Sequence, residues 1–113
     1  MAKPSPVSES SAHLHLTEAL PVVAESTTSR VLVTNGVMRI VQFTFDAGEM
    51  LTAHASPRAV AVQLVSGRML FTVDGTEHAM SEGDLIYLAP NASHSLVAET
   101  PCRMTLVMVD LTD

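Results

Sequence analysis

The sequence predicts one small all-β domain, built as a β-sandwich or barrel. The chain has 113 residues, which is the usual length of a single domain and too short for two ordinary ones. Short apolar runs are separated by turn residues about every eight to twelve positions, a spacing typical of sandwiches and barrels. From residue 29 onward no stretch shows the period of an amphipathic helix. We therefore expect a barrel domain at 29–113.

The beginning of the chain has a different composition. Residues 1–12 are rich in Pro and Ser and carry almost no apolar side chains, so we expect 1–28 to form a flexible N-terminal arm. One short helical turn is predicted at 17–20, because Pro21 cannot continue a helix.

The strands are predicted by alternation and by the turns between them. Asn35-Gly36 and Asp74-Gly75 are dipeptides that favour tight hairpin turns. Met69, Phe71 and Val73 share one parity and therefore one face of a strand. The predicted strands are 30–34, 38–45, 68–73, 76–80, 84–88, 94–98 and 103–111.

Composition and charge exclude several classes of partner. Six Lys and Arg face twelve Asp and Glu, for a formal charge of −6, whereas a nucleic-acid partner requires a basic face. No apolar run approaches the roughly 20 residues of a membrane helix. The first residues also lack the apolar stretch of a signal peptide, and the single cysteine, Cys102, cannot form an internal disulfide. These features predict a cytoplasmic protein with no membrane and no nucleic-acid partner.

Two stretches are more specific than the strand pattern. The first is GEMLTAHAS at 48–56, which continues to Gly67, and the second is GDLIYLAPNASH at 83–94. Their spacing resembles the two motifs of the cupin superfamily: a Gly, five residues, His-x-His, a Glu and a closing Gly, then Gly-Asp and Pro-x-x-x-His. The resemblance extends over residues 37–111. It implies a small single-domain cupin of the type-2 conserved-barrel kind, that is, a double-stranded β-helix or jelly-roll barrel.

The resemblance also implies a divalent metal, such as zinc, iron, manganese or nickel, inside the barrel. His54 matches the first His of the family's pattern and His94 matches the last. Ser56 stands at the second His position and Val60 at the Glu position, and neither is a normal ligand for such an ion. His78 has the strand parity of an inward-facing residue and is a candidate third imidazole. Alternatively, the metal is absent and His54 and His94 are pocket histidines bonded to backbone or water.

The barrel interior is expected to bind a small organic ligand, because ligand sites are mostly apolar with a few polar groups. The tyrosine hydroxyl at position 87 is a candidate donor, and Arg58 is either a carboxylate-binding residue or an exposed rim residue. The expected pocket residues are Ser56, Val60, Met69, Phe71, Tyr87 and Met104.

The sequence leaves the biochemical role open between three alternatives. The first is a ligand-binding cupin with a vestigial or atypical metal site at His54 and His94. The second is a metal-dependent oxygenase or isomerase acting on a small organic substrate, for which no catalytic residue can be assigned. The third is a regulatory or scaffold subunit. A homodimer is expected in each case, because Val62, Val65 and Leu70 exceed what one core face needs.

Overall fold

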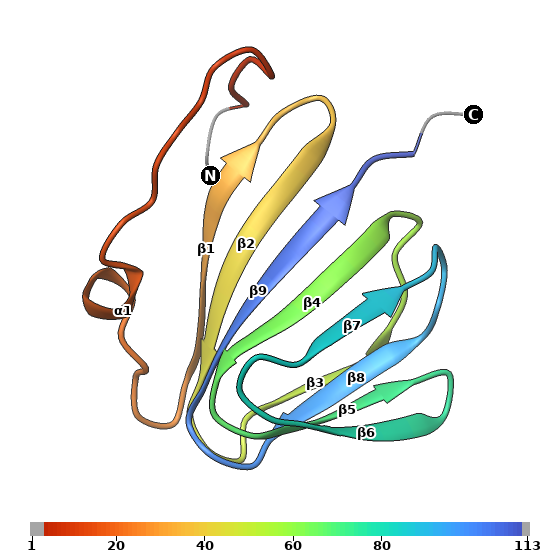
Figure 1. The fold of residues 1–113 in the computed structure, drawn as a ribbon. Coiled ribbons are helices and arrows are strands. Elements are labelled where there is room, and N and C mark those ends of the chain that lie inside the picture. Colours follow the sequence, from red (N-terminus) through yellow and green to blue (C-terminus); the bar gives the residue numbers. More distant parts are fainter. Residues whose placement is uncertain (1–3, 112–113) are drawn as a thin grey trace.

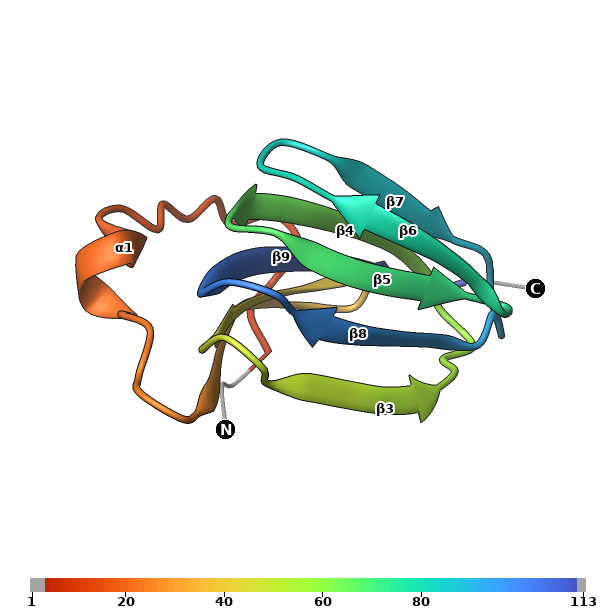
Figure 2. The same ribbon diagram turned by 90° about the horizontal axis from the view of Figure 1, so that it is seen from below.

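Two antiparallel β-sheets face each other in the computed structural model, which describes residues 4–111 (Figures 1 and 2). The larger sheet has the strand order β1-β2-β9-β4-β7, and the smaller sheet has the order β3-β8-β5-β6. The elements are α1 (Leu16–Ala19), β1 (Thr27–Thr34), β2 (Met38–Phe45), β3 (Met50–His54), β4 (Ala59–Ser66), β5 (Met69–Val73), β6 (Thr76–Met80), β7 (Leu85–Leu88), β8 (His94–Ala98) and β9 (Cys102–Val109). This arrangement confirms the predicted all-β, cupin-type double-stranded β-helix.

The turns follow the chemistry of their residues. The Oδ1 atom of Asn35 accepts hydrogen bonds from the backbone N–H groups of Val37 and Met38, each at 2.9 Å, and so closes the β1–β2 hairpin. Asp74 and Gly75 both have positive φ, at 46° and 84°, which is the backbone of the tight hairpin turn that their dipeptide predicts. Strands β2, β6 and β8 have the bounds expected from alternation.

The hydrophobic core lies between the two sheets. In the larger sheet, Leu64, Met104 and Phe43 lie opposite one another across neighbouring strands and share the inner face. Val62 lies on the same inner face, in the row next to that of Leu64, and is fully buried. The expectation that Val62 exceeds what the core needs was therefore wrong. The largest fully buried side chains are Phe45, Phe71, Leu64, Met69, Leu88, Met104, Val62, Thr44 and Cys102.

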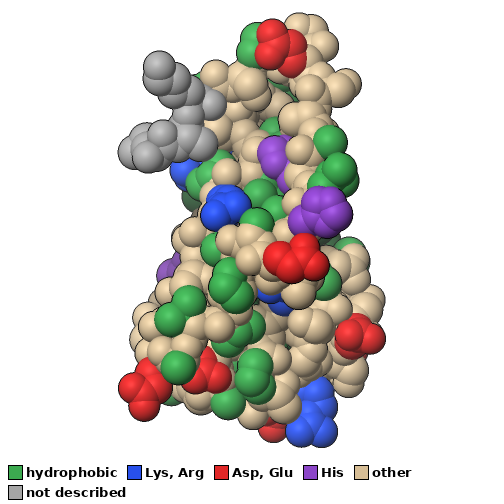
Figure 3. Space-filling view, turned by 90° about the vertical axis from the view of Figure 1, so that its left-hand side faces the viewer, with side chains coloured by type: hydrophobic (Ala, Val, Ile, Leu, Met, Phe, Trp, Pro, Cys, Tyr) green, Lys and Arg blue, Asp and Glu red, His purple; other side chains and the backbone are tan. Residues whose placement is uncertain are grey.

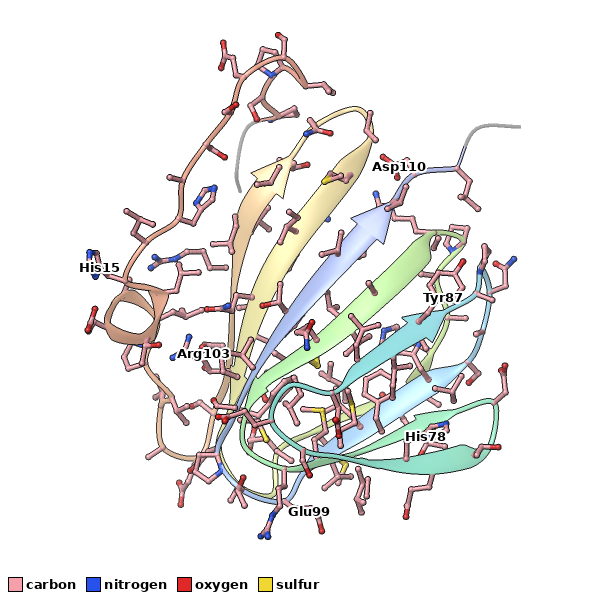
Figure 4. All side chains as sticks on the ribbon, in the orientation of Figure 1. His15, His78, Tyr87, Glu99, Arg103 and Asp110 are labelled. Carbon is pink, nitrogen blue, oxygen red and sulfur yellow. The ribbon has the colours of Figure 1, made fainter. Side chains whose placement is uncertain are left out.

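The N-terminal segment is tied to the outside of the larger sheet by Arg103. This side chain is 5% exposed, and its guanidinium donates to the carbonyl oxygens of Leu16 and Thr17, both at 3.4 Å, and of Leu20 at 2.8 Å (Figure 4). The helical turn expected at 17–20 is observed at Leu16–Ala19. Residues 27 and 28, assigned to the arm by sequence, belong to β1, and residues 1–3 of the arm lie outside the described residues.

The surface on the side of the N-terminal segment is neither uniformly charged nor uniformly hydrophobic. Figure 3 shows it with hydrophobic side chains scattered among acidic, basic and histidine side chains. His13 and His15 are both exposed, with a side-chain exposure of 82% for His15. Within residues 4–111, no helix is both long enough and apolar enough to cross a membrane.

Gly67 is the residue at which the fold leaves no room for a side chain. Its φ of +92° is a left-handed conformation, and an added Cβ would collide with the carbonyl oxygen of Pro101 and lie 2.7 Å from the Sγ atom of Cys102. Gly67 follows β4, and Cys102 begins β9. The glycine that closes the first motif therefore allows two neighbouring strands of the larger sheet to meet at their ends.

We predict that Gly67→Ala lowers the free energy of unfolding by about 2 kcal/mol or more, because it combines overpacking with an unfavourable φ. Chemical denaturation followed by circular dichroism measures the change. Gly36→Ala is the matched control, since a Cβ at Gly36 meets nothing within 4 Å. Equal stability of the two variants would contradict the prediction.

Candidate functional site at the open end of the barrel

One end of the barrel is surrounded by connections rather than by packed core. The β3–β4 connection and the β7–β8 loop are joined there by a hydrogen bond from the Asn91 N–H to the Ser56 carbonyl, at 2.7 Å. The β5–β6 turn meets the same loop through the Asp74 N–H and the Ser93 carbonyl, at 2.8 Å. These segments lie along the right-hand side of Figure 1, and the end of β9 lies above them. We call this region the open end.

A bulge in β3 places the two histidines side by side. Leu51 pairs with Leu96 and His54 pairs with His94, so three residue steps on β3 correspond to two on β8. Because alternate residues of a strand face the same side, His54 would otherwise face away from Leu51. The extra residue turns both side chains inward, and the imidazole centroids of His54 and His94 lie 4.2 Å apart.

Backbone hydrogen bonds define the chemistry of each ring. The Nδ1 atom of His54 lies 3.0 Å from the Thr52 carbonyl oxygen, and that of His94 lies 3.2 Å from the Ala92 carbonyl oxygen. A carbonyl oxygen only accepts, so each Nδ1 carries the proton, and in the neutral ring Nε2 carries the lone pair. Within residues 4–111 neither Nε2 has a hydrogen-bond partner. The two Nε2 atoms are therefore acceptors that remain available to a ligand.

His94 is the more enclosed of the pair. His54 is exposed, whereas His94 is half-buried and its ring stacks on Phe71 with an interplanar angle of 5° and centroids 5.9 Å apart. Burial lowers the pKa of His94 and the neighbouring His54 adds to this effect, while the bond to the Ala92 carbonyl acts in the opposite direction. Burial therefore favours the neutral form of His94, which has an Nε2 lone pair.

Four of the six expected pocket residues lie in the core. Val60, Met69, Phe71 and Met104 are at most 4% exposed and belong to one packed cluster. Of these, Phe71 reaches the histidines through its stacking on His94. The lower part of the barrel is thus filled by side chains.

The other two expected pocket residues are placed differently. Ser56 is half-buried at the rim, where its Oγ accepts the Arg58 N–H at 3.2 Å. Tyr87 is 62% exposed and pairs with Ala61 on the outer face of the larger sheet, whereas Leu88 faces the core (Figure 4). The tyrosine hydroxyl therefore points away from the interior, contrary to expectation.

The residues of the open end do not complete the metal site that the cupin motifs imply. Val60 offers no donor atom, and the Ser56 hydroxyl is engaged by the backbone of its own turn. His78 shares the inner face with Phe71, its partner on β5, but it is exposed and lies on the edge strand β6 (Figure 4). The register places it one row deeper than His94. Within residues 4–111 no group of three or more His, Cys, Asp and Glu side chains is placed to hold an ion. Two imidazoles are fewer than the three protein ligands of ordinary catalytic zinc sites.

Two arginines lie in this region, and sequence reasoning missed one of them. A cavity of about 720 Å³ is lined by Ser56, Pro57, Arg58, Asp110 and Leu111, and in it the Nε of Arg58 donates to the Asp110 carboxylate at 2.7 Å. Arg39 was not considered from sequence, although it shares the parity of Val41, Phe43 and Phe45 and so belongs to the inner face of β2.

Comparison with known proteins identifies the family. Residues 41–109 match the model of the cupin domain family, and because this match covers more than half of the chain, the protein belongs to that family. No curated protein matches the chain.

Solved structures show the same fold. A conserved protein of unknown function from Streptococcus pyogenes is 27% identical, with 100% of this chain and 98% of that chain covered and a TM-score of 0.83. A cupin superfamily protein from Desulfitobacterium hafniense is 15% identical, with coverages of 89% and 93% and a TM-score of 0.80. Salicylate 1,2-dioxygenase from Pseudoaminobacter salicylatoxidans is 18% identical, with 80% of this chain and 28% of that chain covered and a TM-score of 0.71. At these last two identities the similarity concerns the fold alone.

We predict that His94 titrates below the ordinary histidine pKa, in the direction given by its burial. The unfolded chain then binds this proton more readily than the folded chain does. The stability contributed by neutral His94 is fully present above about pH 6.5 and is lost as the pH falls below that value.

Proton NMR titration of the imidazole signals checks this prediction, with His94→Gln identifying the His94 signal. A His94 pKa at or above the ordinary histidine value of about 6.5 would contradict it.

Proposed function

We propose that this cupin binds a small organic ligand at the open end of the barrel, beside a vestigial metal site at His54 and His94. The observation that carries the proposal is the pair of adjacent imidazoles, 4.2 Å apart, with both Nε2 atoms free. Each ring is held by its Nδ1 bond to the backbone, so the acceptors are oriented before a ligand arrives. Such pre-organisation reduces the entropic cost of binding.

The surroundings of the pair suit a small molecule. Phe71 and the partly buried Leu51 and Val73 supply apolar surface beside the rings. A cavity of about 720 Å³ also lies at the open end, where it is lined by Ser56 and Arg58 and not by the histidines. Its volume lies within the range of about 300–1,000 Å³ usual for ligand sites. A few polar groups beside an apolar floor are the common composition of such sites.

The donor set favours ligand binding over metal-dependent catalysis. Two imidazoles without a carboxylate hold a divalent ion weakly, because the remaining positions are left to solvent. Fold similarity to a dioxygenase does not transfer its chemistry, since function depends on the residues of the site. We therefore expect metal in far less than one equivalent.

Elemental analysis of tag-free protein, purified without chelator, tests the metal part of the proposal. The expected metal content is well below one ion per chain. Near-stoichiometric metal that is lost in His54→Ala and in His94→Ala, but kept in His13→Ala, would overturn the proposal in favour of an oxygenase or isomerase.

A thermal-shift screen of metal-free protein with small carboxylates, alcohols and aromatic compounds tests the ligand part. A ligand at one hundred times its Kd stabilises the fold by about 2.7 kcal/mol, which should raise Tm by about 10 °C in a domain of this size. His94→Ala should abolish the shift and His13→Ala should keep it. The absence of a shift with every compound, together with a copurifying protein, would favour a scaffold subunit.

We further propose that the protein forms a homodimer through the outer face of the larger sheet. One uncharged row crosses all five strands of this face. It consists of residues that pair with one another from strand to neighbouring strand: Val33, Ile40, Val107, Ala61 and Tyr87. The chain has a formal charge of −6, so charges on two copies repel each other. This repulsion is smallest where an uncharged surface faces the same surface of the other copy. An apolar row of this kind meets that condition.

Tyr87→Glu should weaken the dimer at least about tenfold, because it introduces a charge that must be desolvated on both copies. Light scattering across a dilution series measures the mass against 12.0 kDa for one chain. Val97→Glu, at an exposed position on the smaller sheet, is the control and should leave the dimer intact. A wild-type monomer at all concentrations would contradict this proposal.

A further inference from the structure

We propose that the cavity between the β3–β4 connection and the end of β9 binds a zwitterionic α-amino acid with an apolar side chain. The inference goes beyond the proposed function, because this cavity is not lined by the histidine pair and its ligand is held without the imidazoles. The cavity has a volume of about 720 Å³ and is lined by Ser56, Pro57, Arg58, Asp110 and Leu111.

Backbone hydrogen bonds fix both walls of the cavity. On one side, the Ser56 carbonyl accepts the Asn91 N–H at 2.7 Å, and the Ser56 Oγ accepts the Arg58 N–H at 3.2 Å. On the other side, the Asp110 N–H donates to the Val37 carbonyl at 2.8 Å. The two charged residues are thus in place before a ligand arrives, which reduces the entropic cost of binding.

The cavity contains one cation and one anion that satisfy each other only in part. The Arg58 Nε donates to the Asp110 Oδ1 at 2.7 Å, and the Arg58 Nη1 has only the Met108 Sδ, 3.9 Å away, as a partner. Within residues 4–111 the Arg58 Nη2 and the Asp110 Oδ2 have no hydrogen-bond partner. The side chains of Arg58 and Asp110 are 35% and 41% exposed, so a ligand can reach both.

This pair of charges selects a ligand that carries both signs. A carboxylate binds the two Nη atoms of an arginine through parallel hydrogen bonds, and an ammonium group donates to a carboxylate oxygen. A ligand with only a negative charge is repelled by Asp110, and a ligand with only a positive charge is repelled by Arg58. Because the chain has a formal charge of −6, a ligand without net charge also avoids the long-range repulsion that an anion meets.

The short distance within the pair limits the ligand further. Since the Arg58 Nε and the Asp110 Oδ1 are 2.7 Å apart, the two charged groups lie side by side, and the opposite charges of the ligand must be neighbours as well. An α-amino acid meets this requirement, because its ammonium and carboxylate groups are attached to one carbon atom. Pro57 and Leu111 supply apolar surface. Leu111 is 55% exposed, so an apolar ligand side chain would remove this surface from water.

Four compounds of nearly equal shape separate the contributions of the two charges. L-Leucine carries both charges, isocaproate only the carboxylate, leucinamide only the ammonium group, and isocaproamide neither. Binding to isotope-labelled protein is measured by two-dimensional NMR titration at about pH 6.5, where an α-amino group is protonated. We expect leucine to bind at least about tenfold more tightly than each other compound and to shift the amide signals of Ser56, Arg58 and Leu111.

Two substitutions assign the charges. Arg58→Gln should bind leucine no more tightly than leucinamide, because the partner of the carboxylate is lost. Asp110→Asn should bind leucine no more tightly than isocaproate, because the partner of the ammonium group is lost. An exposed ion pair contributes little to stability, so both variants should remain folded, which circular dichroism checks. Arg68→Gln is the control and should bind leucine as wild type does, since Arg68 is exposed and lies at the opposite end of the barrel.

The outcomes separate this inference from the proposed function. No binding of leucine, equal binding of leucine and a singly charged compound by wild type, or an unchanged preference in Arg58→Gln and Asp110→Asn overturns the inference and leaves the proposed function untouched. His94→Ala should bind leucine as wild type does. Loss of leucine binding in His94→Ala would place the ligand at the histidine pair and overturn the separate site.

Discussion

The pairing of β3 with β8, and the bulge within it, is the constraint on which the site depends. A strand alternates its side chains with a period of two, so a regular β3 could present either Leu51 or His54 to the interior, but not both. Leu51 pairs with Leu96 in the core layer, while His54 pairs with His94 at the open end. The bulge accommodates both demands: it preserves the apolar layer and directs two imidazoles to one place. Bulges are common beside functional sites for this reason.

Alternation explains which parts of the fold the sequence could predict. Strands β2, β6 and β8 were located correctly because each has turn residues on both sides, such as Asn35-Gly36 before β2 and Asp74-Gly75 before β6. Tyr87 was placed wrongly because all four residues of β7 are apolar or aromatic, so the strand has no alternation that orients it. Only the pairing with β4 shows that Leu88 faces the core and Tyr87 faces outward.

The composition of the pocket could not be derived from parity alone. Parity identifies the inner face but not the depth along the barrel, and Val60, Met69, Phe71 and Met104 all face inward within a closely packed core. His78 illustrates the same limit, since it faces inward yet lies on an edge strand and in a deeper row than His94. Depth follows from the register between strands, which depends on turn lengths and bulges. The motif resemblance located His54 and His94 because it carries this long-range information.

The electrostatics of the open end follow from one position. The inner row that contains Arg39 continues through Met108 to Val60, so Arg39 and Val60 lie two strands apart, at roughly 10 Å. The cupin motif implies a glutamate where this chain has Val60. A carboxylate there would have supplied a metal ligand and also a negative charge in the same row as Arg39. With valine at position 60, the two imidazoles lack that carboxylate, and Val60 brings no negative charge to the row that contains Arg39.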